Sequence, residues 1–373
     1  MIRRTLLTRR NLLVGLGAAS AGAAALAAPR IIGGRKKKQV GYAIVGLGSY
    51  GLGQIIPQFA NCRLSRLTAL VSGDPEKARR VAAEHEVPER SIYGYEDFDR
   101  IRDNPDVDVV YVVLPNSMHA EYTIRAAAAG KHVLCEKPMA VSSAECEAMI
   151  AACRKAGRRL MIGYRSHFEP HNLHAMRLAR EEAVGRSRFV QSEHGFSIGD
   201  PAQWRLKRAL AGGGSMMDIG IYSVQALRYM AGEEPVSVIA TEQTDRSDPR
   251  FSEVEDRVSW SFLYPSGLVG HGFSSYSSGH SHIRLTGSEG WIDMEPATPY
   301  GGHAMRVRKG GETRGVTPPP GPAVNQFAGQ LDHMAECVLE GREPIVAGEE
   351  GLRDMRIIEA IYRSAAEGRR IDL

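Results

Sequence analysis

Two short segments of the chain carry side chains that can move protons. Lys137 stands in a Cys-Glu-Lys-Pro segment, and Asp218 and Tyr222 stand four residues apart after three glycines, residues 212–214. Burial and a neighbouring positive charge lower the pKa of a lysine, so Lys137 can donate or accept a proton. On a helix Asp218 and Tyr222 share a face, and a lysine beside a tyrosine favours its phenolate. The glycines permit close backbone approach to a ligand. From these residues alone, a surface lysine and a packed tyrosine remain the alternatives.

A glycine-rich motif follows the first apolar run of the regular part of the chain. Its first glycine allows a tight turn, its second lets a pyrophosphate approach the backbone, and its third lets the next helix pack on the strand. The helix N-terminus then stabilises the phosphates. A strand before the motif and a helix after it predict a dinucleotide site. The motif consists of Gly46, Leu47, Gly48, Ser49, Tyr50 and Gly51.

The end of the second expected strand indicates which dinucleotide is bound. A site for NAD places Asp or Glu here, where it binds the ribose 2′-hydroxyl. The residue 21 positions after Gly51 is Ser72, and Lys77 is close behind. A neutral serine and a lysine accept a 2′-phosphate, so we expect NADP. Asp74 is the counter-argument, because a small shift of register would make it the ribose ligand.

The histidines are numerous, but their spacing does not form a metal site. His167, His171 and His174 lie close together in the sequence, yet Pro170 interrupts a shared helix and no cysteine accompanies them. Metal sites need three or four ligands that converge. We therefore expect no metal.

Strand-like and helix-like stretches alternate from residue 40 to residue 163. The stretch 107–114, VDVVYVVL, is a continuous apolar β-branched run, which is typical of a central parallel strand. The alternation predicts a doubly wound parallel sheet of the Rossmann type, whose ligands bind beyond the carboxyl ends of the strands. The expected strands are 40–46, 66–72, 107–114, 131–136 and 159–163, and the expected helices are 49–59 (kinked or ended by Pro57), 75–85, 117–129 and 142–156.

After residue 163 the pattern changes to strands separated by glycine-containing turns. This predicts an α+β domain built on an open, largely antiparallel sheet, so the fold class is α/β with a second α+β domain. The expected strands are 188–196, 236–244, 257–264, 268–276, 281–286 and 290–294, and the last expected helices are 326–339 and 349–367.

The N-terminus has the plan of an export signal. A basic segment precedes an alanine- and glycine-rich apolar stretch, and Arg9-Arg10 stands in a twin-arginine motif. We expect a cleaved signal peptide (1–27), an arm (28–39), a dinucleotide-binding domain (40–163) and a substrate-binding and oligomerisation domain (164–373).

Without the arginines of the signal, basic and acidic residues are equal in number. A neutral protein gives no reason to expect nucleic acid or, after cleavage, a membrane as partner.

Several segments together resemble the glucose–fructose oxidoreductase/inositol dehydrogenase/rhizopine-catabolism family. They are the glycine motif, VVYVVLPNSMHAEYTIRAAAAGKHVLCEKPMA and AGGGSMMDIGIY. The resemblance extends from Gly41 to Leu373 and is most specific for the glucose–fructose (aldose–aldose) oxidoreductase branch, because that branch has tyrosine where most of the family has histidine, at Tyr222. Further segments resemble the branch: ALVSG, DPAQWRL, GEEP, SSYS and NQFAGQLDH.

The resemblance implies roles for particular side chains. Lys137 and Tyr222 would handle the proton of a sugar hydroxyl, and Asp218 would orient the substrate or Lys137. Ser72 and Lys77 would hold the 2′-phosphate of NADP. The residues that would line the nicotinamide and phosphate side are Pro115, Asn116, His119, Glu136, Arg165, Trp204 and Arg205.

The resemblance and the export signal together imply a closed redox cycle. A periplasm has no useful pool of free nicotinamide nucleotide, so an exported enzyme must carry NADP out tightly bound. We expect one aldose to be oxidised at C1 to its lactone and a second sugar to be reduced to the alditol, with ping-pong kinetics. A dehydrogenase with exchangeable cofactor and an NAD-dependent glycosidase are the alternatives. Because the arm is short, a homodimer through the open sheet is expected rather than an arm-linked tetramer.

Overall fold

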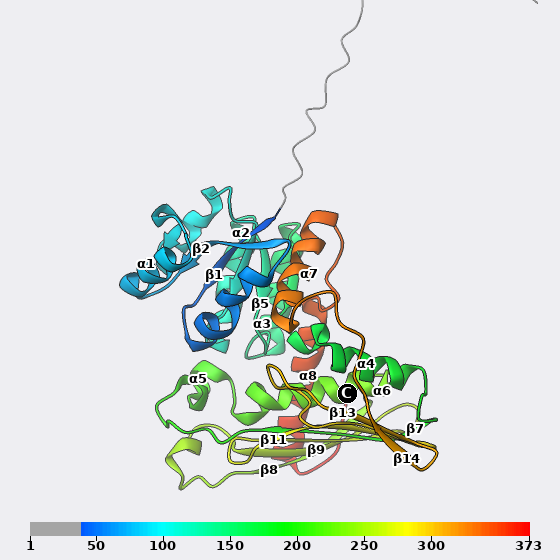
Figure 1. The fold of residues 1–373 in the computed structure, drawn as a ribbon. Coiled ribbons are helices and arrows are strands. Elements are labelled where there is room, and N and C mark those ends of the chain that lie inside the picture. The colour runs from blue at the N-terminus through cyan, green and yellow to red at the C-terminus, as the bar shows by residue number, and fades with distance from the viewer. Residues whose placement is uncertain (1–38) are drawn as a thin grey trace, which may run out of the picture. The chain divides into compact units, whose positions relative to one another are not determined.

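The computed structural model describes residues 39–373, so the predicted signal and nearly all of the predicted arm lie outside the described residues. The first part of the described chain forms a six-stranded parallel sheet in the order β3-β2-β1-β4-β5-β6. Its helices α1, α2 and α3 lie around this sheet (Figure 1). The strands are Val40–Val45 (β1), Ser65–Val71 (β2), Ile92–Tyr93 (β3), Val109–Val112 (β4), His132–Cys135 (β5) and Leu160–Ile162 (β6), and the helices are Pro75–Glu84 (α1), His119–Ala128 (α2) and Ser143–Lys155 (α3).

The centre of this sheet is apolar throughout, as the sequence predicts for a parallel sheet covered on both faces. Every residue of β1 and β4 is buried. The two strands lie side by side, with Tyr42 opposite Val109 and Val45 opposite Val112. Both therefore end at the same edge of the sheet, where the glycine motif leaves β1.

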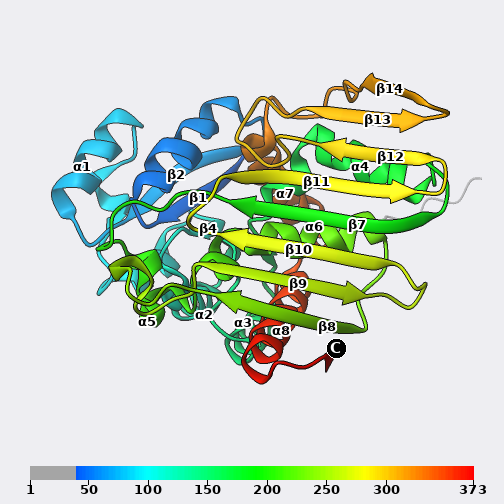
Figure 2. The same cartoon turned by 90° about the horizontal axis from the view of Figure 1, so that it is seen from below.

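The second part of the chain forms a nine-stranded sheet in the order β14-β13-β12-β11-β7-β10-β9-β8-β15. All neighbouring strands are antiparallel except β7 and β10. Helices α4 and α6 lie on one face of this sheet, and no helix of the described chain covers the other (Figure 2). The strands are Ser187–Gly195 (β7), Ser237–Gln243 (β8), Arg257–Leu263 (β9), Val269–Ser275 (β10), His280–Gly287 (β11), Gly290–Met294 (β12), Met305–Lys309 (β13), Glu312–Gly315 (β14) and Ile371–Asp372 (β15).

The last two helices return to the first sheet. The hydroxyl of Tyr42 in β1 donates to the carbonyl oxygen of Leu331 in α7 at 2.7 Å, and Met161 in β6 forms a bridge with Ala347 just before α8. The core is therefore continuous from one sheet to the other. The remaining helices are Pro170–Arg180 (α4), Arg208–Ala211 (α5), Ile221–Ala231 (α6), Gln326–Glu340 (α7) and Gly348–Glu367 (α8).

The predicted fold class is confirmed, with differences in detail. The four strands β3, β13, β14 and β15 were not expected, because they are short or polar and pair at sheet edges. The segment after the glycine motif is helical over the expected length, but as a π turn at Gly51–Ile55 followed by a 3₁₀ turn at Ile56–Asn61. Pro57 lacks the backbone N–H that a regular α-helix requires there. No helix among residues 39–373 is long and apolar enough to cross a membrane.

Candidate active site

One large cavity, of about 860 Å³, lies where β1, β2, β4 and β5 end. This volume is in the range of sites for small molecules and cofactors. The glycine motif forms one wall, and the segment Asp218–Tyr222 forms another. Every predicted site residue lines this cavity except His119; the lining ones are Gly46, Leu47, Gly48, Ser49, Tyr50, Gly51, Ser72, Lys77, Pro115, Asn116, Glu136, Lys137, Arg165, Trp204, Arg205, Asp218 and Tyr222.

The glycine motif has the geometry of a dinucleotide cradle. Gly46 has φ +101°, and a Cβ there would lie 2.3 Å from the carbonyl oxygen of Val113. A Cβ on Gly51 would lie 2.8 Å from the carbonyl oxygen of Gly46, so this glycine allows the close contact between turn and helix. A Cβ on Gly48 would meet nothing within 4 Å, because this residue faces the open cavity. The fold requires the first and third glycines, and the second leaves room for a pyrophosphate.

The end of β2 presents Ser72, Asp74 and Lys77 to the cavity. Asp74 caps helix α1: its Oδ1 accepts from the backbone N–H of Lys77 at 2.9 Å, and its Oδ2 lies 3.7 Å from the Lys77 ammonium. The backbone N–H of Lys77 is the main cause that holds the pKa of Asp74 below its usual range. The Asp74 carboxylate is thus engaged within its own turn, and Lys77 is the cation at this end of the cavity.

Lys137 and Asp218 form the centre of the cavity's polar wall. The Lys137 ammonium donates to the Asp218 carbonyl oxygen at 2.5 Å and to its Oδ1 at 3.2 Å. The other carboxylate oxygen of Asp218 accepts from the Tyr276 hydroxyl at 3.0 Å and lies 3.1 Å from Nε of Arg205. Burial raises the pKa of Asp218, but the charges of Lys137 and Arg205 outweigh burial and lower it. Asp218 is therefore a fixed anion that orients two cations.

The pKa of Lys137 differs from the sequence-based expectation. Burial lowers it, as expected, but the carboxylate of Asp218, with Tyr222 and Glu136, raises it by more. The pKa of Lys137 is therefore above its ordinary value, and the side chain is an ammonium ion. The expectation of a lowered value was wrong because the sequence did not show that the Asp218 carboxylate touches the ammonium group. Lys137 is a hydrogen-bond donor and a positive charge in this cavity.

Tyr222 lies between two cations. Nε of Arg165 donates to its hydroxyl oxygen at 3.1 Å, and the Lys137 ammonium lies 5.0 Å from the centre of its ring. A guanidinium has no acceptor, so the proton of the Tyr222 hydroxyl remains free for an acceptor in the cavity. Arg165 is itself held by the carbonyl oxygens of Thr298 and Pro299 and by Gln326. The arrangement suits Tyr222 to exchange a proton with a bound hydroxyl or carbonyl group.

Glu136 lies buried beside this group. It accepts a hydrogen bond from the Tyr111 hydroxyl, which in turn accepts from Gln330 Nε2 at 2.7 Å. Burial is the largest influence on the pKa of Glu136 and raises it above its usual range. The hydrogen bond from Tyr111 and the charge of Lys137 oppose this rise without cancelling it. The chain of bonds runs from the cavity into α7 and holds the Glu136 side chain in place.

The three glycines at residues 212–214 do not approach a ligand, and that expectation was wrong. A Cβ on Gly213 would lie 2.1 Å from the Tyr362 hydroxyl, and a Cβ on Gly214 would lie 2.1 Å from the carbonyl oxygen of Glu255. The Glu255 carboxylate accepts from the backbone N–H groups of Gly214 and Met216. These glycines therefore let the chain pack against α8 and the segment just before β9, and place Asp218 at the cavity.

His119 lies behind the cavity wall. It is fully buried, and its ring nitrogens contact the carbonyl oxygens of Leu114 and Pro138 at 2.8 and 2.9 Å. Burial lowers its pKa. His119 therefore connects the loop after β4 to the segment that carries Lys137, and it cannot touch a ligand in the cavity. It is a positioning residue in this structure.

Three tyrosines were not predicted as site residues: Tyr95 and Tyr300 line the cavity, and Tyr276 contacts a residue that lines it. Tyr95 lies against Gly73 at the end of β2, Tyr276 bonds Asp218, and the ring of Tyr300 lies 4.9 Å from the Arg165 guanidinium. Only Tyr276 had a sequence signal, since it stands in the SSYS segment. Tyr95 and Tyr300 stand in irregular loops, where the spacing of residues in the sequence does not indicate which way a side chain points.

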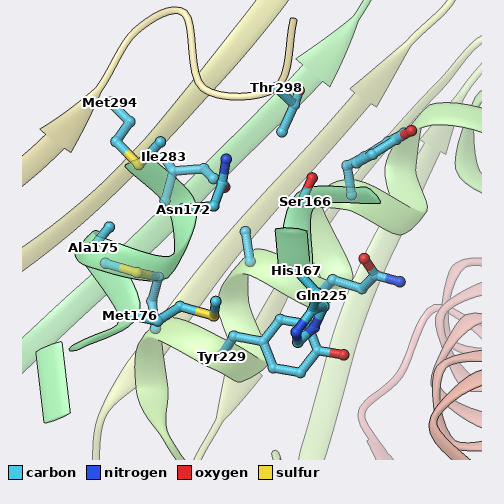
Figure 3. Close-up of a pocket in the computed structure, with 13 residues that line it drawn as sticks. Ser166, His167, Asn172, Ala175, Met176, Gln225, Tyr229, Ile283, Met294 and Thr298 are labelled. Atoms are coloured by element: carbon cyan, nitrogen blue, oxygen red, sulfur yellow. The ribbon is translucent and has the colours of Figure 1, made fainter. Parts of the chain in front are cut away.

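A second, enclosed cavity of about 30 Å³ lies behind Tyr222 and Thr298, between α4, α6 and the second sheet (Figure 3). Ser166 and His167 direct side chains toward it, and their Oγ and Nε2 atoms have no hydrogen-bond partner among the described residues. The volume suffices for one or two water molecules and not for a sugar. Tyr222 therefore separates the large cavity from the core.

Comparisons with known proteins agree with this geometry. Residues 40–164 match the family described as "Oxidoreductase family, NAD-binding Rossmann fold", and residues 180–373 match "Oxidoreductase family, C-terminal alpha/beta domain". The chain belongs to this family, the glucose–fructose oxidoreductase/inositol dehydrogenase/rhizopine-catabolism oxidoreductases.

Individual relatives are sugar oxidoreductases. The solved structure of an aldose-aldose oxidoreductase from Caulobacter crescentus, in complex with glycerol, is 58% identical, with a TM-score of 0.89 over 90% of this chain and 100% of that chain. D-xylose 1-dehydrogenase [NADP(+)] of Haloarcula marismortui is 34% identical over 87% of this chain and 91% of its own length. D-xylose 1-dehydrogenase (NADP(+)) 2 of Haloferax volcanii is 32% identical over 89% of this chain and 99% of its own length.

Proposed function

We propose that this protein is an aldose–aldose type oxidoreductase with tightly bound NADP(H). It oxidises an aldose at C1 to the lactone and reduces a second sugar to the alditol in a ping-pong cycle. The observation that carries the proposal is the group Lys137, Asp218 and Tyr222 in the dinucleotide cavity of a chain 58% identical to an aldose-aldose oxidoreductase. When bound, the dinucleotide supplies the two-electron transfer that the side chains themselves cannot perform.

Lys137, Tyr222 and Asp218 have different roles toward the sugar. An ammonium has three N–H donors, and Lys137 uses two of its three on Asp218, so one is free for a sugar oxygen. Tyr222 accepts a hydrogen bond from Arg165. In the oxidation it would accept the proton of the sugar hydroxyl as a phenolate, and in the reduction it would return that proton from its hydroxyl to the carbonyl oxygen. Asp218 keeps Lys137 and Arg205 in place through one carboxylate oxygen each.

The preference for NADP rests on the end of β2. Lys77 is the cation there, Ser72 is neutral, and the Asp74 carboxylate is already engaged as the cap of α1. We expect Lys77→Ala to weaken NADP binding at least tenfold and to leave NAD binding unchanged, because only NADP carries the 2′-phosphate. Arg80→Ala, an exposed cation on the same helix, is the matched control. Equal losses for both dinucleotides would contradict the assignment of Lys77.

We also propose that the protein is exported to the periplasm by the twin-arginine route and works there as a homodimer. The twin-arginine motif supports the first part. The uncovered face of the second sheet supports the homodimer (Figure 2). Ile239 in β8 and Val269 in β10 are exposed large apolar residues of this sheet. Ile239→Glu is expected to yield monomers in sedimentation experiments, and a wild-type protein that sediments as a monomer would refute the dimer.

A sugar dehydrogenase with exchangeable NADP is the second candidate, and the two D-xylose 1-dehydrogenases favour it. An absorbance spectrum of the purified protein, without added nucleotide, separates the two. For a closed cycle, a reduced-nicotinamide band appears with glucose and disappears with a second sugar. If the band appears only after NADP is added, the cofactor is exchangeable and the ping-pong cycle is wrong.

A further inference from the structure

Three side chains with metal-binding atoms converge outside the large cavity. Glu169, His171 and His303 each place one donor atom within 4.8 Å of the other two. Oε1 of Glu169 lies 2.9 Å from Nδ1 of His171 and 3.5 Å from Nδ1 of His303. The side chains of Glu169 and His303 are each only 5% exposed, and that of His171 is 22% exposed. The cluster is thus enclosed, with an opening on the side of His171.

The carboxylate is held so that one oxygen faces the two rings. Oε2 of Glu169 accepts from the backbone N–H and the side-chain amide of Asn172, at 2.7 and 2.8 Å. The same amide donates to the carbonyl oxygen of Ala297 at 3.1 Å. Outer partners of this kind orient ligands in metal sites. Oε1 is therefore the oxygen that faces the two imidazoles, and an ion there would replace its hydrogen bond with Nδ1 of His171.

The two imidazoles are arranged for a common partner. Their rings are stacked, with centres 5.6 Å apart and planes 15° apart, and both direct Nδ1 toward the same carboxylate oxygen. Nε2 of His303 is buried without a hydrogen-bond partner among the described residues. A ring with so few polar contacts is costly to bury. A metal ion at Nδ1 would give the ring a strong partner on the side that faces Glu169, and Nε2 would then carry the ring proton.

We propose that Glu169, His171 and His303 bind a divalent transition-metal ion of the zinc class. Metal–nitrogen and metal–oxygen distances of about 2.0–2.2 Å place tetrahedral ligand atoms about 3.3 Å apart. The observed separations of 2.9 and 3.5 Å lie on either side of this value. Three protein ligands leave the fourth position to water on the more exposed side. The sequence could not reveal this site, because His303 stands far along the chain from the other two ligands.

The ion would join two segments that border the large cavity. Glu169 caps α4, four residues after Arg165, and His303 ends the loop that contains Thr298 and Tyr300. Arg165 and Tyr300 line the large cavity. Metal bound at the cluster therefore fixes the loop beside the sugar-binding region. This inference does not depend on the identity of the sugar or of the dinucleotide.

The test uses cobalt(II), whose visible absorption reports nitrogen and oxygen coordination, added to the whole metal-free protein. We expect a saturable visible band that zinc displaces. His303→Gln should weaken binding more than about tenfold, since the loss of even an outer partner costs that much. His174→Gln is the matched control, because this partly exposed histidine on α4 contacts Arg177 and not the cluster.

Five outcomes decide the proposal. A band lost in His303→Gln and kept in His174→Gln supports it. No band at millimolar cobalt, or equal loss in both variants, overturns it. If His303→Gln does not fold, His171→Gln takes its place, and an unchanged affinity in that variant also overturns it. A rise in melting temperature with zinc in the wild type, absent from the ligand variant, supports the site independently of colour.

Discussion

The Tyr222 hydroxyl offers the sharpest test of the proposed chemistry. Tyr222→Phe removes one oxygen, and the ring can keep its place 4.9 Å from the Arg165 guanidinium and 5.0 Å from the Lys137 ammonium. The cavity keeps its shape, because the side chain is only 9% exposed and packed on its other side. Cofactor binding should therefore persist while proton exchange with the sugar is lost.

The magnitudes follow from the contacts. General acid–base catalysis contributes about 10²–10⁴-fold, so turnover should fall by that factor, or about 3–5 kcal/mol in activation free energy. The change also removes the hydrogen bond from Arg165 Nε at 3.1 Å. A bond to a charged group contributes about 1.5–3 kcal/mol, so the free energy of unfolding should fall by a similar amount. The loss of activity should greatly exceed what partial unfolding explains.

Tyr229→Phe is the matched control. Tyr229 lies two turns later on α6, and its hydroxyl donates to the Glu350 carboxylate at 3.2 Å. The same atom is removed and a bond to a charged group is lost, but outside the large cavity. The assay is the rate of sugar oxidation at saturating sugar, with bound nucleotide measured in the same samples. If Tyr222→Phe turns over like the wild type, or if Tyr229→Phe loses as much activity, the assignment of Tyr222 is refuted.

Four further substitutions test the fold and its electrostatics. Gly46→Ala should lower the melting temperature of the nucleotide-free protein, because its Cβ would lie 2.3 Å from a carbonyl oxygen at φ +101°. Gly48→Ala should leave that temperature unchanged and weaken dinucleotide binding, because its Cβ would meet only the cavity; equal melting temperatures of the two nucleotide-free variants would contradict this. Asp354→Ala should cost about 1.5–3 kcal/mol in urea unfolding, since it removes the carboxylate 2.5 Å from the buried Arg228, which keeps Glu234 and Glu350 as partners; a loss below 1 kcal/mol would contradict it. Burial lowers the pKa of His167 to about 4, so the neutral ring stabilises the fold above pH 6.5, and about 3 kcal/mol is lost as the pH falls from 6.5 to 4. His167→Gln should remove that part of the acid destabilisation, measured as urea midpoints at pH 7 and 4.5, and an unchanged pH dependence would contradict it.

The first sheet was predictable because its signals are local. A continuous apolar run such as residues 109–112 must be buried on both faces, and a glycine at Gly46 is the residue that tolerates φ +101° against a neighbouring strand. The strands β13 and β14, at one end of the second sheet, were not predictable, because their short, largely exposed and polar sequences resemble a loop. β13 depends on β12 for its backbone partners, and β14 depends in turn on β13.

The site was predictable in its members and not in its electrostatics. Motifs placed Lys137, Asp218 and Tyr222 at one cavity, yet the sign of the pKa shift of Lys137 depends on a carboxylate 81 residues away whose oxygen lies 3.2 Å from the ammonium. Charge interactions depend steeply on distance and burial, and sequence spacing gives neither.

The sequence by itself determined the dinucleotide-binding fold, the strand ends that carry the site and the side chains available for proton transfer, because each depends on residues close together in the chain. Only the tertiary structure decided that residues 212–214 pack against protein, that His119 lies behind the cavity wall, and that His303 meets Glu169. Each of these depends on segments more than ten residues apart meeting in space, and the approach of such segments is set by the packing of the whole core.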